Sequence, residues 1–246
     1  MLFFKKKGEK KPTYKTLADL KNIHEGERCF IIGNGPSLRF EDLDKLKNEW
    51  TFAVNRIYLG FDQTKWRPTY YAIQDSKILD QYADDVAALD LPYKFIPKQY
   101  EGKVKNPKGQ VFYYNYTVRL FNGTSALFSD DISQVTYEGG TVTFLCMQIA
   151  FYMGFKEIIL LGNDFNYSLE KTKDGVIVNN VKDYFTDKYI GNTDTRFYPR
   201  IDLCAQGFEL ARKKAEEKGI KIYNATRGGK LEIFERIDFD SLTFKR

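Results

Sequence analysis

The first segment of this 246-residue sequence with side chains suited to chemistry is a Gly-Asn-Gly-Pro-Ser loop, which directly follows the apolar run 28–32. Glycines let a ligand approach the backbone closely, and backbone N–H groups near a helix start can face a phosphate. The spacing is neither that of a Rossmann G-x-G-x-x-G loop nor that of a Walker A loop, and a tight turn is the alternative interpretation. The loop residues are Gly33, Asn34, Gly35, Pro36 and Ser37.

Polar residues also close three further apolar runs. They are Asn55, Gln74, Asp75, Gly162 and Asp164. An amide at such a position suits recognition of a base or a ribose, while a turn-forming Asn or a helix-capping Asp remains open at each. Thr141 and Thr143, which follow a Glu-Gly-Gly run, make a second candidate anion site at the start of a helix.

Short apolar runs alternate with helical stretches along the chain, and this alternation predicts an α/β fold with a doubly wound, mostly parallel sheet. The expected strands are 28–32, 51–55, 70–75, 93–96, 111–114, 157–161 and 220–223. The expected helices are 16–23, 41–47, 76–88, 141–153 and 199–218. We predict a tail and short helix in 1–27, followed by a single domain, 28–246. Ligands of such sheets bind beyond the carboxyl ends of the strands, where the polar residues lie.

Composition excludes several function classes. The formal net charge is +5, from 38 basic and 33 acidic residues that are interspersed, which is not typical of nucleic-acid binding. The single histidine, His24, and three cysteines without paired spacing argue against a histidine-based metal site, a zinc site and a Ser-His-Asp triad. The cysteines read as buried free thiols. No apolar run reaches the roughly 20 residues that span a bilayer, so we expect a cytoplasmic protein.

Several of these motifs together resemble known families. The runs FIIGNGPSL at 30–38, VN at 54–55 and GFKEI at 154–158, which leads into GNDF at 162–165, resemble two related groups. One is the bacterial sialyltransferases of glycosyltransferase family 42, and the other is the 6-hydroxymethylpterin diphosphokinase MptE-like domain. The resemblance spans about residues 28–223 and implies a Rossmann-like sheet in the style of a GT-A variant.

The two resemblances imply different ligands. The sialyltransferase group implies a CMP-sugar donor and a glycan acceptor, with no cofactor or metal. It implies donor-site roles for Asn34, Asn55, Thr141, Thr143, Gly162 and Asp164. The diphosphokinase group implies ATP and Mg²⁺, held by carboxylates such as Asp75 or Asp164.

The chain departs from the sialyltransferase pattern at three positions. Asn166 stands where the family has a tyrosine, with Tyr167 one residue later, and Gly139 replaces an arginine. Asn192 replaces the histidine base of the family's Tyr-Ile-Gly-His run. Because an amide cannot accept a proton as a general base, a non-catalytic nucleotide-sugar-binding module is a further alternative.

Residues 163–197 are rich in Tyr and Asp and lack periodicity, so we predict a long loop that acts as a lid over the donor. Hydroxyl groups such as those of Tyr167 and Tyr189 could hydrogen-bond the leaving phosphate. With Asn192 in place of the histidine, Asp194 is the candidate base, unless it caps the helix that begins near Pro199.

We therefore expect a glycosyltransferase-like enzyme that uses a nucleotide-activated sugar, with a CMP-sugar as the favoured donor. It would act on a surface-glycan precursor at the cytoplasmic face of the membrane. An ATP-dependent diphosphokinase is the second interpretation. A peripheral membrane contact through the apolar and lysine-rich start of the chain stays open, as does a homo-oligomer.

Overall fold

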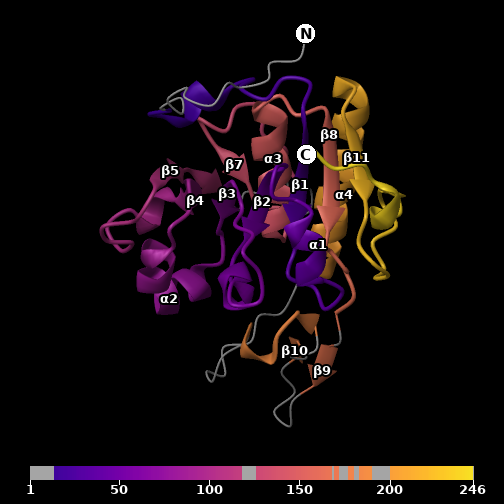
Figure 1. Cartoon of the computed structure of the whole chain (residues 1–246). Coiled ribbons are helices and arrows are strands. Elements are labelled where there is room, and N and C mark those ends of the chain that lie inside the picture. The colour runs from indigo at the N-terminus through magenta and orange to yellow at the C-terminus, as the bar shows by residue number, and fades with distance from the viewer. Residues whose placement is uncertain are drawn as a thin grey trace.

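The computed structural model describes residues 14–117, 126–167, 169–171, 177–179, 183–189 and 200–245. An eight-stranded sheet forms its centre (Figure 1), with the strand order β12-β11-β8-β1-β2-β3-β4-β5. Its strands are β1 (Arg28–Ile32), β2 (Trp50–Val54), β3 (Tyr70–Ala72), β4 (Tyr93–Pro97), β5 (Gln110–Tyr114), β8 (Glu157–Leu161), β11 (Lys221–Asn224) and β12 (Glu235–Arg236). Every neighbouring pair is parallel, so all eight carboxyl ends lie at one edge.

Helices cover both faces of the sheet, which confirms the predicted α/β doubly wound fold. They are α1 (Phe40–Asp44), α2 (Ser76–Ala88), α3 (Val142–Tyr152) and α4 (Ile201–Lys218). Alternate residues of β1 separate the two layers: Cys29 and Ile31 pack in the cluster that holds α3 and α4, whereas Phe30 and Ile32 pack in the cluster that holds α1 and α2. A strand that is buried on both faces has a continuous apolar sequence, and for this reason β1 could be predicted from residues 28–32.

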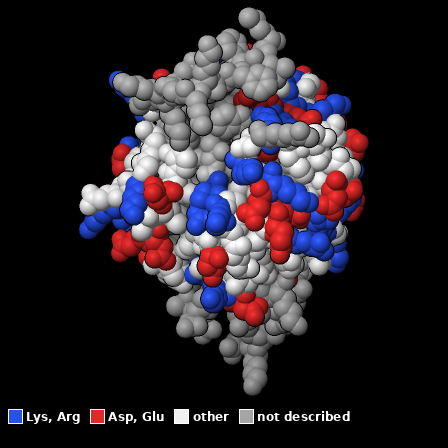
Figure 2. Space-filling view, in the orientation of Figure 1, with Lys and Arg blue, Asp and Glu red and all other residues white. Residues whose placement is uncertain are grey.

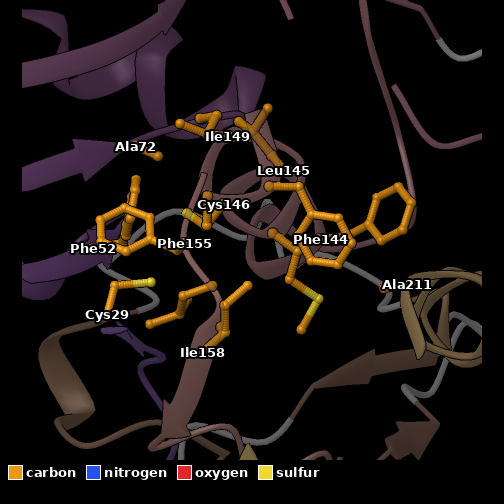
Figure 3. Close-up of a cluster of buried hydrophobic side chains, with 14 of the residues drawn as sticks. Cys29, Phe52, Ala72, Phe144, Leu145, Cys146, Ile149, Phe155, Ile158 and Ala211 are labelled. Atoms are coloured by element: carbon orange, nitrogen blue, oxygen red, sulfur yellow. The ribbon is translucent and has the colours of Figure 1, made fainter. Parts of the chain in front are cut away.

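Helix α3 is buried along its whole length. Figure 3 shows Phe144, Cys146 and Ile149 from this helix grouped with Phe52 of β2 and Ile158 of β8. Packing against both the sheet and α4 leaves α3 no polar face, so its hydrophobicity reflects a central position in the core. No helix in the described part of the chain is long and apolar enough to cross a membrane.

The segment before β1 packs with the domain. It contains the 3₁₀-helix η1 (Leu17–Leu20), whose Leu20 is fully buried in the same cluster as α3. The ring of His24 lies between Glu27 and Tyr70, with its nitrogens 2.6 Å from Glu27 Oε2 and 2.6 Å from the Tyr70 hydroxyl. The expected short helix is therefore a single 3₁₀ turn, and this histidine contributes to packing at the base of the sheet.

Short elements complete the described chain. They are η2 (Ile57–Gly60), η3 (Lys98–Tyr100), η5 (Asp187–Tyr189), η6 (Phe239–Ser241), β6 (Tyr116–Thr117), β7 (Thr136–Tyr137), β9 (Leu169–Lys171) and β10 (Ile177–Asn179). β9 and β10 form an antiparallel pair, and with η5 they lie within the stretch expected to be one long loop. Strands of three residues are too short to produce a visible hydrophobic period, so the sequence did not indicate them.

The outer surface carries charges of both signs. Figure 2 shows Lys and Arg side chains close to Asp and Glu side chains over the described part of one face. Several form ion pairs, such as Arg227 with Asp42 and Asp240. All three cysteines are buried free thiols, as predicted.

Candidate functional site

The strand order reverses at β1. The chain adds β2 to β5 on one side of β1 and later places β8, β11 and β12 on its other side. Such a switch point opens a crevice beyond the carboxyl ends of the strands. A cavity of about 490 Å³ lies there. The segments that follow β1, β2, β3 and β8 line it, together with the starts of α2, α3 and α4. Its volume is in the range of small-molecule sites.

The glycine loop after β1 packs tightly against the loop after β8. The N–H groups of Gly33 and Gly35 donate to the carbonyl oxygens of Leu161 and Gly162, at 2.8 and 2.9 Å. A Cβ atom on Gly33 would lie 2.4 Å from the Gly162 carbonyl oxygen, and one on Gly35 would lie 1.9 Å from Asp164 Oδ2. These glycines are therefore required for contact between the two loops, and their N–H groups are not available to a phosphate.

Asp164 holds the two loops together. Ser37 Oγ donates to Asp164 Oδ2 at 2.8 Å, and the Lys230 N–H donates to the Asp164 carbonyl oxygen. The side chain is 8% exposed, and burial raises the pKa of its carboxyl group, partly offset by the bonds from Ser37. The carboxylate lines the cavity, but its hydrogen bond with Ser37 connects the two loops and so stabilises the fold.

Thr141 and Thr143 at the start of α3 are also engaged within the protein. Thr141 is the N-cap residue, and its side chain accepts from the Thr143 N–H. The Thr143 hydroxyl donates to Asn163 Oδ1 at 2.8 Å, while Asn163 Nδ2 donates to the Ile31 and Leu161 carbonyls. Asn163 thus connects α3 to the ends of β1 and β8. The Thr143 hydroxyl is used in this connection, whereas the Thr141 oxygen acts as the helix cap.

A different set of polar atoms in the cavity wall has no hydrogen-bond partner among the described residues. The buried atoms are Asn34 Oδ1, Asn55 Oδ1, Arg56 Nε and Gln74 Nε2. Asn34 Nδ2 donates to the Val54 carbonyl and to the Tyr189 hydroxyl, so its amide plane is fixed with the oxygen left over. Buried polar atoms are almost always paired, and each unpaired one costs stability. Their concentration at adjacent strand ends indicates a ligand-binding wall.

Asp75 follows β3 and caps α2, with Oδ1 accepting from the Ile78 N–H at 3.0 Å. Burial raises the pKa of this carboxyl group to about 6, and the helix-start N–H groups and Lys77 offset only part of that rise. The carboxyl group is therefore mostly ionised at pH 7 and gains its proton as the pH falls through about 6. Both roles considered for Asp75, helix cap and site carboxylate, are thus met by one side chain.

Tyrosines close the cavity on the side of the predicted lid. The rings of Tyr184 and Tyr189 stack with centroids 4.0 Å apart, and the Phe185 N–H donates to the Asn34 carbonyl. Burial raises the pKa of the Tyr167 and Tyr189 phenols, so both stay protonated and can donate a hydrogen bond. Residues 183–189 are therefore attached to the first loop.

Most of the site residues expected from the sequence line this one cavity. They are Gly33, Asn34, Gly35, Asn55, Asp75, Thr141, Thr143, Gly162, Asp164, Tyr167 and Tyr189. Pro36 and Ser37 do not line it, because the chain turns away behind the loop. Asp194 and Asn192 lie outside the described residues. The described residues contain no cluster of three or more His, Cys, Asp or Glu placed to hold a metal ion.

Sequence reasoning missed several lining residues, which are Arg56, Tyr82, Arg200 and Cys204. Asp183 and Tyr184 also line the cavity and belong to the stretch 163–197 predicted as the lid. Arg56 could have been noticed, because it directly follows Asn55 at the end of a buried strand. Cys204 and Arg200 approach the cavity only through the packing of α4. Burial raises the pKa of the Cys204 thiol to about 12, so it is protonated at neutral pH.

Comparison with known proteins identifies the family of the chain. The family model described as "6-hydroxymethylpterin diphosphokinase MptE-like" matches residues 6–170, which is more than half of the sequence. The chain belongs to this MptE-like family. No curated protein sequence matches it.

Two solved structures share its fold. The MAf glycosyltransferase from Magnetospirillum magneticum AMB-1 has a TM-score of 0.56 and 16% identity, over 94% of this chain and 38% of that protein. The chain therefore spans well under half the length of that protein. The sialyltransferase CstII from Campylobacter jejuni, solved with cytidine-5'-monophosphate, has a TM-score of 0.51 and 17% identity, over 87% of this chain and 85% of that one. These likenesses establish a common α/β fold.

Proposed function

We propose that this MptE-like protein is a glycosyltransferase that uses a nucleotide-activated sugar, with a CMP-sugar as donor. The observation that carries the proposal is the row of unpaired buried amide and guanidinium atoms at the switch-point cavity. A nucleotide offers the hydroxyl, base and phosphate groups that such atoms bind. The fold shared with two glycosyltransferases, one solved with cytidine monophosphate, supports the choice of donor.

Sugar transfer from such a donor breaks the bond between the sugar and the phosphate and forms a bond to an acceptor hydroxyl. The protonated phenols of Tyr167 and Tyr189 would donate to the leaving phosphate. A base must take the acceptor proton, and Asp194 remains our candidate. The acceptor would be a surface-glycan precursor presented at the cytoplasmic face of the membrane.

The family name favours a second candidate, an ATP-dependent diphosphokinase. Such an enzyme needs Mg²⁺, which takes carboxylate oxygens, substrate phosphates and water as ligands. Asp75 and Asp164 both line the cavity and are the carboxylates we would assign to it. Asp164 accepts from the Ser37 hydroxyl and Asp75 accepts from the Ile78 N–H, so each carboxylate would bind a cation in addition to these bonds.

A thermal-shift panel separates the two candidates. CMP, UDP, GDP and ATP are added to the full chain with and without Mg²⁺. A ligand at 100 times its dissociation constant stabilises the fold by about 2.7 kcal/mol. We expect CMP to raise the melting temperature without Mg²⁺. A rise only with ATP and Mg²⁺ would instead support the diphosphokinase.

The assignment of the base has its own test. Asp194→Ala should lose sugar transfer to the acceptor while keeping the affinity for CMP. Wild-type turnover in this variant would remove Asp194 as the base. Binding of CMP by the wild-type chain, with no transfer to any acceptor tried, would favour the non-catalytic binding module.

A further inference from the structure

Phosphate groups in α/β proteins are commonly bound by a glycine loop or a helix start. In this protein the glycine loop is already used, because the Gly33 and Gly35 N–H groups donate to the end of β8. The starts of α2 and α3 are used as well: Asp75 accepts from the Ile78 N–H and Thr141 accepts from the Thr143 N–H. These N–H groups are not available to the phosphate of a donor, which favours a partner among the side-chain donors of the cavity wall.

Arg56 is a buried cation in the cavity wall. It follows β2, is 6% exposed and has no ion pair with any carboxylate of the described residues. Burying a charge without a counter-charge is costly, and such residues are rarely kept without a function. A ligand anion would supply the missing counter-charge.

The geometry of Arg56 is fixed by its surroundings. One terminal nitrogen, Nη1, donates to the carbonyl oxygens of Lys188 and Tyr189. The guanidinium carbon lies 4.2 Å from the ring centroid of Tyr82, at the point where α2 departs from helical geometry. The buried Nε has no partner. The side chain is thus held in place with a donor left over, which is the preorganised state that anion binding requires.

A second unpaired donor lies at the neighbouring strand end. Gln74, which follows β3, lines the same cavity, and its Nε2 is buried without a partner. β2 and β3 are adjacent and parallel, so their carboxyl ends bring Arg56 and Gln74 to the same part of the edge. The unpaired atoms of Asn34 and Asn55 are acceptors, which suit hydroxyl and amino groups and repel a phosphate.

We propose that Arg56, assisted by Gln74, binds the phosphate of the nucleotide donor, at the β2–β3 side of the cavity. This assignment rests on the proposed function, since it takes the donor to be a nucleotide. It places the anion away from the glycine loop that dominates the sequence motif. It also connects the phosphate to η5, because the same guanidinium holds the carbonyls of Lys188 and Tyr189.

The test compares a nucleotide with its nucleoside. The affinities of CMP and cytidine for the full chain are measured by calorimetry in the wild type, Arg56→Gln and the matched control Arg67→Gln. Arg67 is exposed and does not line the cavity, and its guanidinium carbon also lies 4.2 Å from a ring centroid, that of Phe61. Arg56→Gln should weaken CMP about 10- to 100-fold and leave cytidine within about twofold, since only CMP carries the charge-assisted bonds. Arg67→Gln should change neither by more than about twofold.

Three results would overturn the assignment. The first is equal weakening of CMP and cytidine by Arg56→Gln, which indicates a positioning role only. The second is an unchanged affinity of Arg56→Gln for CMP, and the third is an effect of Arg67→Gln on CMP as large as that of Arg56→Gln. If Arg56→Gln does not fold, Gln74→Leu replaces it, with a loss of at least about threefold expected for CMP alone. An equal effect of Gln74→Leu on both ligands then counts against the proposal.

The donor and the phosphate site can fail separately. If the chain binds an adenine nucleotide and no cytidine nucleotide, the CMP donor is wrong, and the same comparison with AMP and adenosine still tests Arg56. If no nucleotide binds at all, both proposals are wrong.

Discussion

Two regions of the cavity wall differ in how many of their buried polar groups have hydrogen-bond partners within the protein. On the side of β1 and β8, the loop hydrogen bonds of Gly33, Gly35 and Ser37 are completed within the protein, with Asn34 Oδ1 as the exception. On the side of β2 and β3, the side chains of Asn55, Arg56 and Gln74 leave buried atoms unpaired. The first region is built as a closed contact between two loops, and the second is built to be completed by a ligand. The most recognisable motif of the sequence therefore lies in the more structural of the two.

The largest expected effect is in the closed region. Gly35→Ala should lower the free energy of unfolding by at least about 3 kcal/mol, because the new Cβ would meet Asp164 Oδ2 at 1.9 Å and the Gly162 carbonyl at 2.9 Å. Urea denaturation measures the loss. Gly102→Ala is the control, since nothing lies within 4 Å of its Cβ, and it should change stability by less than about 0.5 kcal/mol. Equal stability of the two variants would contradict the close contact of the loops.

Asp75 belongs to the open region, since it follows Gln74 at the end of β3, and it gives a pH-dependent prediction. Its pKa of about 6 in the folded state is above the ordinary aspartate value of 3.8, so the native state keeps its proton to a higher pH than the unfolded state. Its contribution to the free energy of unfolding therefore falls as pH rises from about 4 to 6. Asp75→Asn keeps a good N-cap residue and removes this penalty.

We expect Asp75→Asn to be about 2 kcal/mol more stable than the wild type at pH 7 and equally stable at pH 4. Urea denaturation at the two pH values measures the difference. A difference that does not change with pH would show that the carboxyl group titrates normally.

A smaller effect is expected for the bond that closes the loop contact. Ser37→Ala, Asp164→Ala and the double variant form a double-mutant cycle for the 2.8 Å hydrogen bond between them. We expect a coupling energy of about 1 to 2 kcal/mol, because the bond is charge-assisted and partly buried. Additive effects of the two substitutions in urea denaturation would mean that the bond does not stabilise the fold. Asp164 would then have a role in the ligand site alone.

The smallest effect on stability is expected in the open region. Gln74→Leu removes a buried Nε2 that has no partner, so the free energy of unfolding should stay the same or rise by up to about 1 kcal/mol. The same denaturation series measures it beside Ser37→Ala. A loss above about 1 kcal/mol would show that the Gln74 amide is bonded within the protein, and the contrast between the regions would disappear.

The sequence predicted strands well where burial on both faces gives a continuous apolar run, and helices where apolar residues recur at helical spacing. The expected strand 157–161 coincides with β8 (Glu157–Leu161), and the expected helix 76–88 coincides with the amphipathic α2 (Ser76–Ala88). The two- and three-residue strands β6, β7, β9, β10 and β12 were missed because they have no long apolar run, whereas the three-residue β3 begins one and was found. It placed most of the cavity-lining residues, because parallel strands bring their carboxyl ends to one edge.

The sequence by itself determined the α/β class, the buried strands and the set of polar residues that close them, because these depend on local hydrophobic patterns. Only the tertiary structure decided which polar atoms are already paired. Gly35 and Asn55 look equally suited to a ligand in the sequence, yet the N–H of one meets the Gly162 carbonyl and the amide oxygen of the other meets nothing. Hydrogen-bond partners more than a hundred residues apart, such as Ser37 and Asp164, follow from the strand order, and no local pattern encodes that order.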